Sequence, residues 1–133
     1  MKLEKILEEY VKKHIPLSSA MGIKVKLATP EKIILSAPIA NNINHKKTVF
    51  GGSLHSVATL SCWSLLFVNL VAIPGEQVEI VIASSEIEYL TPITHDFEAE
   101  CHIPNEVEWE RFVKIFNKKG RARLNLESKI FIA

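Results

Sequence analysis

Residues 50–73 read FGGSLHSVATLSCWSLLFVNLVAI, and this stretch decides the fold. Two glycines open it, and it contains no Asp, Glu, Lys or Arg from Ser53 to Ile73. Its apolar side chains cover every face of a helix, and such a helix is buried in protein or in lipid. The length would just reach across a bilayer, but polar residues interrupt the stretch and no basic cluster flanks it. The sequence therefore predicts a central helix wrapped by a sheet and ended by Pro74-Gly75.

The size and composition of the chain fit one soluble globular domain, residues 1–133. Apolar residues make up 47% and charged residues 23%, and the net charge of +1 gives no indication of a nucleic-acid partner. The two cysteines, Cys62 and Cys101, lie within apolar patterns, which favours small buried side chains over a disulfide. The Lys-rich and Glu-rich N-terminus does not resemble a secretion signal, so we expect a cytoplasmic protein.

The remaining segments alternate between helical and strand patterns. Apolar spacing predicts helices over residues 2–14 and 106–117, and alternation predicts strands over residues 23–27, 33–39, 77–89, 97–103 and 122–132. Pro38 indicates that its strand lies at an edge or ends there. A polar loop, residues 40–49, leads into the glycine pair. These patterns predict an α+β fold, with a curled antiparallel sheet of about five strands around the central helix.

Three segments resemble a known family. They read NINHKKTVFGGSL at residues 42–54, EIEYLTPI at residues 86–93 and KGRARL at residues 119–124, and the likeness extends over about residues 20–132. Together they resemble the thioesterase branch of the hotdog-fold superfamily, which some bacteria carry as a domain fused behind an acetyltransferase domain. The resemblance implies acyl thioester substrates carried on coenzyme A or acyl carrier protein, with no other cofactor. It also implies a homodimer or a dimer of dimers, with active sites at the subunit interface.

The glycine pair is the candidate site for the substrate carbonyl. Backbone N–H groups at the start of a helix are unpaired and carry partial positive charge. A thioester carbonyl placed at Gly51, Gly52 and Ser53 would be polarised there, and its developing oxyanion would be stabilised. Glycine lets the backbone come close to a ligand. We therefore expect Gly52 and Ser53 to act in catalysis, and Phe50 and Gly51 to contact the substrate.

Hydrolysis also needs a group that activates water. Many hotdog thioesterases use an Asp or Glu in the loop before the helix or about seven residues past the glycine pair. Here the loop offers Asn42 and Asn44, and the helix position is Thr59. Asn44 and Thr59 could hold a water by hydrogen bonds, and His45 is a candidate base. His55 is more consistent with a core or interface residue. Glu86 or Glu88 could supply a carboxylate, but a solvated strand face explains them as well.

A basic group around a predicted turn consists of Lys119, Arg121 and Arg123, together with Lys118. The phosphates of coenzyme A or an acidic carrier protein would suit it, and a solvated face is the alternative. No His, Cys and Asp grouping has the spacing of metal ligands, so we expect no metal. Two other functions stay open, namely a 3-hydroxyacyl thioester dehydratase or hydratase, and a non-catalytic acyl-CoA-binding module.

Overall fold

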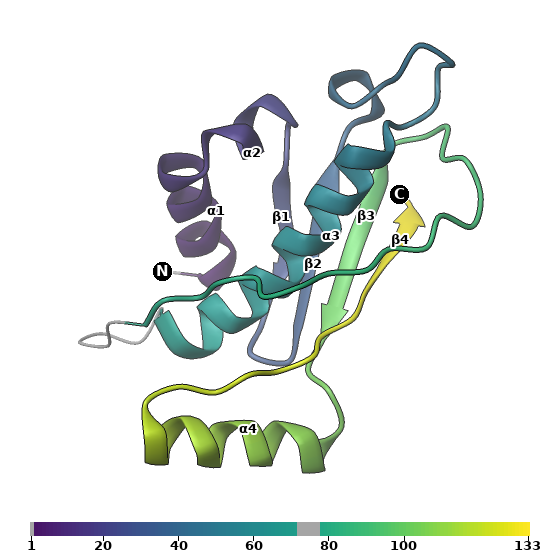
Figure 1. The fold of residues 1–133 in the computed structure, drawn as a ribbon. Coiled ribbons are helices and arrows are strands. Elements are labelled where there is room, and N and C mark those ends of the chain that lie inside the picture. Colours follow the sequence, from purple (N-terminus) through teal and green to yellow (C-terminus); the bar gives the residue numbers. More distant parts are fainter. Residues whose placement is uncertain (1, 72–77) are drawn as a thin grey trace.

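The computed structural model describes residues 2–71 and 78–133, and Figure 1 shows their arrangement. Two short helices come first and lead into a hairpin, the long central helix follows, and the remaining strands flank one further helix. The elements are α1 (Leu3–His14), α2 (Pro16–Ala20), β1 (Lys24–Ala28), β2 (Lys32–Ala37), the 3₁₀ turn η1 (Ile39–Asn41), α3 (Gly51–Leu66), the π-helical turn η2 (Phe67–Val71), β3 (Phe97–His102), α4 (Glu106–Lys119) and β4 (Ser128–Ile132).

The four strands form one antiparallel sheet in the order β1-β2-β3-β4, and α3 packs against β2, β3 and β4. The inward faces of β2 and β3 carry the alternating apolar residues that the sequence indicated, and all of them are buried: Ile33, Leu35, Ala37, Phe97, Ala99 and Cys101. These residues meet the apolar side chains of α3 in one core. The predicted α+β architecture, an antiparallel sheet packed on a central apolar helix, is confirmed.

Helix α3 is long because η2 continues it. From Gly51 to Leu70 it is the one described helix with the length and hydropathy of a membrane span. Its contacts with the sheet identify it as the core helix of the domain, as the sequence predicted. The predicted helix end at Pro74-Gly75 lies outside the described residues.

Helix α1 closes the β1 edge of the sheet. Leu7 and Val11 are buried against the core, while two carboxylates on the same helix reach the strand backbone. Glu4 Oε2 accepts a hydrogen bond from the Ala28 N–H at 2.7 Å, and Glu8 Oε1 accepts one from the Val25 N–H at 2.8 Å. The bond from Ala28 lowers the pKa of Glu4. The edge N–H groups, which would otherwise offer a template for another strand, are thereby occupied.

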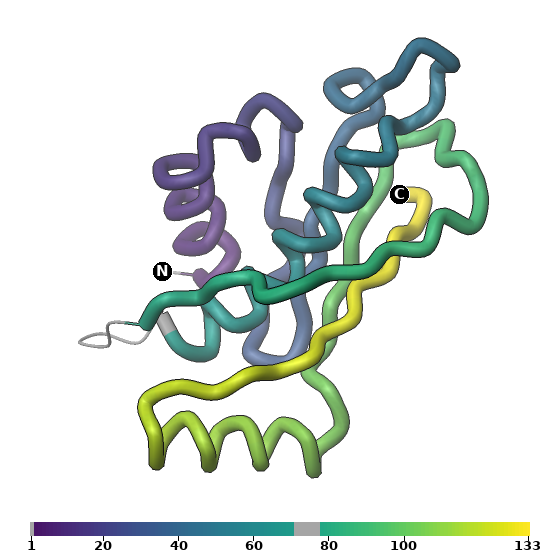
Figure 2. Tube along the Cα trace, in the orientation of Figure 1, coloured from purple at the N-terminus to yellow at the C-terminus, as the bar shows by residue number. Residues whose placement is uncertain are grey.

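Two strand predictions were wrong in extent. Residues 78–89 are extended but form no ladder, and Gln77 lies outside the described residues. Of the predicted strand over 122–132, only Ser128–Ile132 pairs, so the described residues form four strands instead of about five. Figure 2 shows the stretch after residue 78 crossing in front of α3, while the stretch that leads from α4 to β4 runs below that helix. An alternating pattern indicates that one face of a segment is apolar, but it does not indicate whether another strand lies beside that segment.

The other predicted elements are confirmed. The helix over 106–117 appears as α4, which Asn105 caps by accepting a hydrogen bond from the Glu108 N–H at 2.9 Å. Gly120 ends this helix with φ of 75°, a conformation that favours glycine. Strand β2 ends at Ala37, directly before Pro38, and lies inside the sheet between β1 and β3, so Pro38 marks an end and not an edge.

Candidate active site at the amino end of α3

The first turn of α3 leaves two backbone donors free. Phe50 is extended, with φ of −60° and ψ of 132°, and its carbonyl accepts hydrogen bonds from the N–H groups of Ser53 at 2.9 Å and Leu54 at 3.2 Å. Within the described residues, the N–H groups of Gly51 and Gly52 have no hydrogen-bond acceptor. The free donors at the positive end of the helix are therefore Gly51 and Gly52, whereas the Ser53 N–H is already bonded.

The loop before the helix is fixed by backbone bonds on both sides. The Phe50 N–H donates to the Asn42 carbonyl at 2.7 Å, and the Val49 N–H donates to the Ile93 carbonyl at 2.8 Å. Asn42 is buried, and its Nδ2 donates to the carbonyls of Met21 and Pro38. The glycine pair is thus held in place by segments that lie far apart in the sequence.

Asn44 organises the loop through its side chain. Its Oδ1 accepts from the N–H groups of Lys46 at 2.9 Å and Thr48 at 3.1 Å, and its Nδ2 donates to Thr48 Oγ1 at 2.8 Å. The next residue, His45, is exposed. No described contact brings either side chain to Gly51 or Gly52, so the structure does not unite the two predicted loop candidates with the helix end.

A cleft of ≈ 2440 Å³ lies between α3 and the two unpaired stretches. The α3 residues that line it share one face of the helix: Leu54, His55, Ala58, Thr59, Cys62, Trp63 and Leu66. Thr59 therefore faces the cleft, as a site residue must. Lys119, Arg121 and Arg123 line it as well. The C-terminal end of α4, next to these basic residues, lies below the carboxyl half of α3 in Figure 1 and far from the glycine pair.

Two hydrogen bonds join residues 85–89 to the first turn of α3. The Tyr89 hydroxyl donates to the Gly51 carbonyl at 3.0 Å, and His55 Nε2 lies 3.0 Å from Ser85 Oγ. A Cβ on Gly51 would come within 3.3 Å of the Tyr89 ring, so the ring lies directly on the helix start. Sequence reasoning missed Tyr89 and Ser85, and it interpreted His55 as a core or interface residue. The one available signal was that His55 follows Gly51 by four residues and so shares its face.

The Phe50 ring covers Gly52. A Cβ at Gly52 would lie 2.5 Å from Phe50 Cε2, which is too close for any side chain unless the ring moves. Phe50 itself is 58% exposed and stands beside the two free donors. A ligand that reaches these donors therefore meets this ring, as expected for a substrate contact.

The two cysteines are neighbours, and Cys62 lines the cleft while Cys101 does not. Both thiols are free, Cys101 is buried in β3, and Cys62 is half-buried in α3. The hydrogen bond that the Cys101 thiol donates to Cys62, together with burial, raises the pKa of Cys101. Within residues 2–71 and 78–133, no three His, Cys, Asp or Glu side chains gather in a way that could hold a metal ion.

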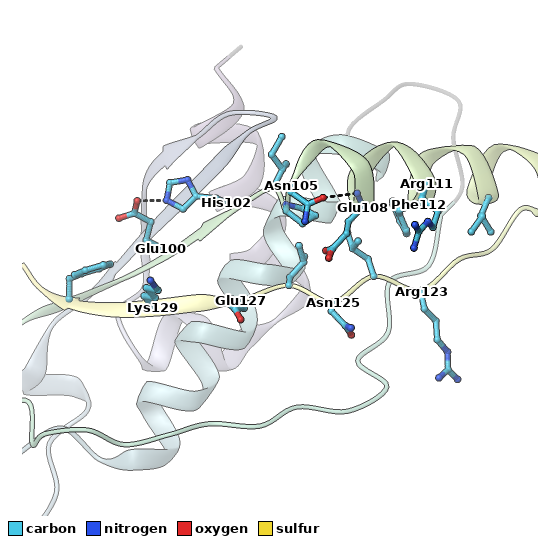
Figure 3. A pocket seen from close by; sticks show the side chains of 16 residues that line it. Glu100, His102, Asn105, Glu108, Arg111, Phe112, Arg123, Asn125, Glu127 and Lys129 are labelled. Atoms are coloured by element: carbon cyan, nitrogen blue, oxygen red, sulfur yellow. Dashed lines mark hydrogen bonds and ion pairs between the residues drawn. The ribbon is translucent and has the colours of Figure 1, made fainter.

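A second, smaller hollow of ≈ 770 Å³ lies between the start of α4 and the strands β3 and β4 (Figure 3). His102 Nε2 and Glu100 Oε1 meet at 2.6 Å on its wall, and the capping bond of Asn105 lies on the other side. Lys32 also pairs with Glu100 at 2.9 Å, and this pairing lowers the pKa of Glu100. Of the predicted site residues, only Arg123 borders this hollow, so it is separate from the helix end.

Comparison with known proteins gives a family match that extends over nearly the whole chain. Residues 4–133 match the model of the family described as "Putative thioesterase (yiiD_Cterm)". A structure of a protein of unknown function from Chlorobaculum tepidum TLS is 32% identical with a TM-score of 0.86, covering 98% of this chain and 79% of that one. The "putative thioesterase" from Shewanella oneidensis is 29% identical with a TM-score of 0.80, covering 98% of this chain and 86% of that one.

A more distant neighbour supports the fold alone. A Pseudomonas aeruginosa protein described as a "Probable Thioesterase" is 18% identical with a TM-score of 0.79, covering 96% of this chain and 83% of that one. Together with the sheet and the central helix, these neighbours confirm the hotdog fold that the sequence resemblance implied.

Proposed function

The chain belongs to the thioesterase family whose model it matches, and from that premise we propose that it hydrolyses acyl thioesters of coenzyme A or acyl carrier protein at the amino end of α3. The observation that carries the proposal is the pair of free N–H groups on Gly51 and Gly52. Both point out of the positive end of a helix that has no acidic residue in its first turn. A carbonyl oxygen bound there gains stabilisation as it becomes an oxyanion.

The cleft supports this substrate class. Its α3 wall is largely apolar and runs from Leu54 past Trp63 to Leu66, which suits an acyl chain or a pantetheine arm. Lys119, Arg121 and Arg123 stand at the other end and are suited to the phosphates of the carrier group. In this arrangement the carbonyl lies at the glycine pair, and the anionic part of the substrate lies near the end of α4.

We further propose that two copies of the chain join along residues 78–90. Hotdog thioesterases are typically oligomeric. This stretch exposes Val81, Ile82 and Leu90, and within the described residues it makes no backbone hydrogen bond to a strand. An extended apolar segment with open N–H and C=O groups is suited to pairing with a second copy. Sedimentation velocity of the wild type and of Val81→Asp tests this, and a wild-type monomer contradicts it.

The decisive experiment removes one donor without disturbing the helix. Gly51 is the first helical residue, and Phe50 before it has ψ of 132°, so a proline fits both backbone positions. Gly51→Pro deletes the N–H group. We expect kcat for acyl-CoA hydrolysis to fall by about 10²–10³, as when one oxyanion donor is lost. Thiol release from a panel of acyl-CoAs measures it.

Gly51→Ala is the matched control, because it keeps the N–H group and also places a carbon against the Tyr89 ring. We expect Gly51→Ala to retain most of the turnover. Equal losses in the two variants would contradict an oxyanion role for this N–H. A wild type that releases no thiol from any acyl-CoA or acyl carrier protein would overturn the proposal. In that case, enoyl absorbance tests the dehydratase or hydratase, and acyl-CoA binding tests the non-catalytic module.

A further inference from the structure

The carboxylate that many hotdog thioesterases use is replaced by Asn44 and Thr59, so the source of the nucleophile is open. One serine and one histidine stand within hydrogen-bond reach at the cleft, since Ser85 Oγ lies 3.0 Å from His55 Nε2. A hydroxyl this close to an imidazole nitrogen is the arrangement that activates a serine. Ser85 lines the cleft, so a substrate bound in the cleft can reach it.

His55 is directed toward the free donors. Helical side chains lean toward the amino end of their helix, so the His55 side chain extends in the direction of the turn that contains Gly51 and Gly52. His55 is in the first turn and on the same face as Gly51. A thioester carbonyl held by the two N–H groups would therefore have the imidazole beside it.

Tyr89 keeps Ser85 at this place. The two residues belong to one extended stretch, and the Tyr89 hydroxyl bonds the Gly51 carbonyl at 3.0 Å. The stretch from Ser85 to Tyr89 is thus attached to the first turn of α3 at both ends, once through His55 and once through Gly51. The nucleophile, the base and the oxyanion donors are consequently brought together by a single helix turn and one crossing segment.

We propose that Ser85 is the nucleophile of this hydrolase and His55 its general base, an inference that rests on the proposed thioesterase function. With the proton of the neutral ring on Nδ1, Nε2 accepts the Ser85 hydroxyl proton while Oγ attacks the carbonyl carbon. An O–C bond forms, the C–S bond breaks, and the proton passes from Nε2 to the departing thiolate. Water then attacks the acyl-serine carbonyl and gives a proton to Nε2. The bond from the acyl carbon to Ser85 Oγ breaks, and Nε2 returns the proton to Oγ as the free acid leaves.

Adjacent and matched residues provide the controls. Ser85→Ala and His55→Gln each should lower kcat for acyl-CoA hydrolysis by about 100-fold or more, the usual contribution of such groups. Ser84→Ala changes a serine of the same stretch, and His95→Gln changes a histidine that bonds to Thr94 and does not line the cleft. Both controls should turn over at the wild-type rate. Thermal denaturation of all four variants separates a loss of chemistry from a loss of folding.

A second measurement separates a catalytic role from a structural one. A fluorophosphonate probe should label Ser85 in the wild type, located by mass spectrometry of the peptide, and His55→Gln should abolish the label while the variant stays folded. A Ser85→Ala variant that keeps the wild-type rate of hydrolysis overturns the inference. A wild-type protein that hydrolyses acyl-CoA but is not labelled at Ser85 overturns it as well. If the wild type hydrolyses no thioester, the proposed function fails. The labelling experiment still tests whether His55 activates Ser85 as a nucleophile.

Discussion

At the β1 edge of the sheet, helix α1 supplies side-chain acceptors to the strand, whereas beyond β4 the stretches 78–90 and 121–127 cross the molecule without a ladder. The first region buries Leu7 and Val11 and occupies its edge N–H groups with Glu4 and Glu8. The second exposes apolar side chains, and its backbone pairs with no strand among the described residues.

The difference shows which side of the sheet is covered by its own chain and which side is open to a ligand or a second copy. In the α1 region, the N–H groups of Val25 and Ala28 already have acceptors within the same chain. The stretches 78–90 and 121–127, which we call the open region, surround the cleft. Two side-chain hydrogen bonds, from Tyr89 and Ser85, join this region to the start of α3. Stability should therefore depend on the first region, and turnover on the second.

The largest expected effect compares the same substitution in the two regions. Leu7 is 0% exposed and Leu90 is 80% exposed. We expect Leu7→Ala to lower the free energy of unfolding by about 2–5 kcal/mol, because it removes buried methyl groups and leaves a cavity. Leu90→Ala should change the free energy by less than about 0.5 kcal/mol in the monomer. Urea denaturation at low protein concentration measures both, and equal losses would mean that the two regions are equally packed.

A smaller effect concerns the carboxylates on the closed edge. Glu4→Gln replaces the charged acceptor of the Ala28 N–H with a neutral one, and we expect a loss of about 1 kcal/mol at pH 7. Because the folded pKa of Glu4 is lowered, its contribution is fully present above the ordinary value of 4.5 and is lost as pH falls through the folded pKa. The variant should therefore lose less stability than the wild type below about pH 4.5.

The exposed Glu9, whose side chain makes no hydrogen bond or ion pair among the described residues, gives the matched control. Glu9→Gln should leave both the stability at pH 7 and its decline in acid unchanged. Urea denaturation of the three proteins between pH 7 and pH 3 makes the comparison. A Glu4→Gln profile that parallels the wild type in acid would show that this carboxylate does not close the edge.

The sequence predicted the parts of the fold that local pattern controls. The uncharged run after Ser53 indicated the buried helix, and alternation located β2 and β3 because their inward faces pack on that helix. Asn105 and Gly120 bracket α4 in the way that helix ends require. Residues 78–89 carry a strand pattern too, but pairing depends on a neighbour, which no local pattern contains.

The site was predictable only as far as it is local. The glycine pair at a helix start identified the donors, yet the bond from the Ser53 N–H to the Phe50 carbonyl, which leaves Gly51 and Gly52 free, depends on the path of the chain at Phe50. Ser85 and Tyr89 reach the helix across 30 and 38 residues of sequence. Such contacts follow from tertiary packing, and so spacing alone did not reveal them.

The smallest expected effect comes from removing one hydroxyl of the open region, that of Tyr89. The Gly51 carbonyl and the Gly52 N–H belong to the same peptide group, so the bond from Tyr89 to the carbonyl polarises the N–H that faces the substrate. We expect Tyr89→Phe to lower kcat by about 2–10-fold with KM nearly unchanged, because the bond acts chiefly on the developing oxyanion.

Tyr10, the other tyrosine of the chain, packs on Trp63 and Phe67, away from the glycine pair. Tyr10→Phe should leave kcat and KM unchanged, and steady-state kinetics with one acyl-CoA compares the two variants. If Tyr89→Phe raises KM and leaves kcat alone, the hydroxyl serves binding and not the polarisation of the peptide.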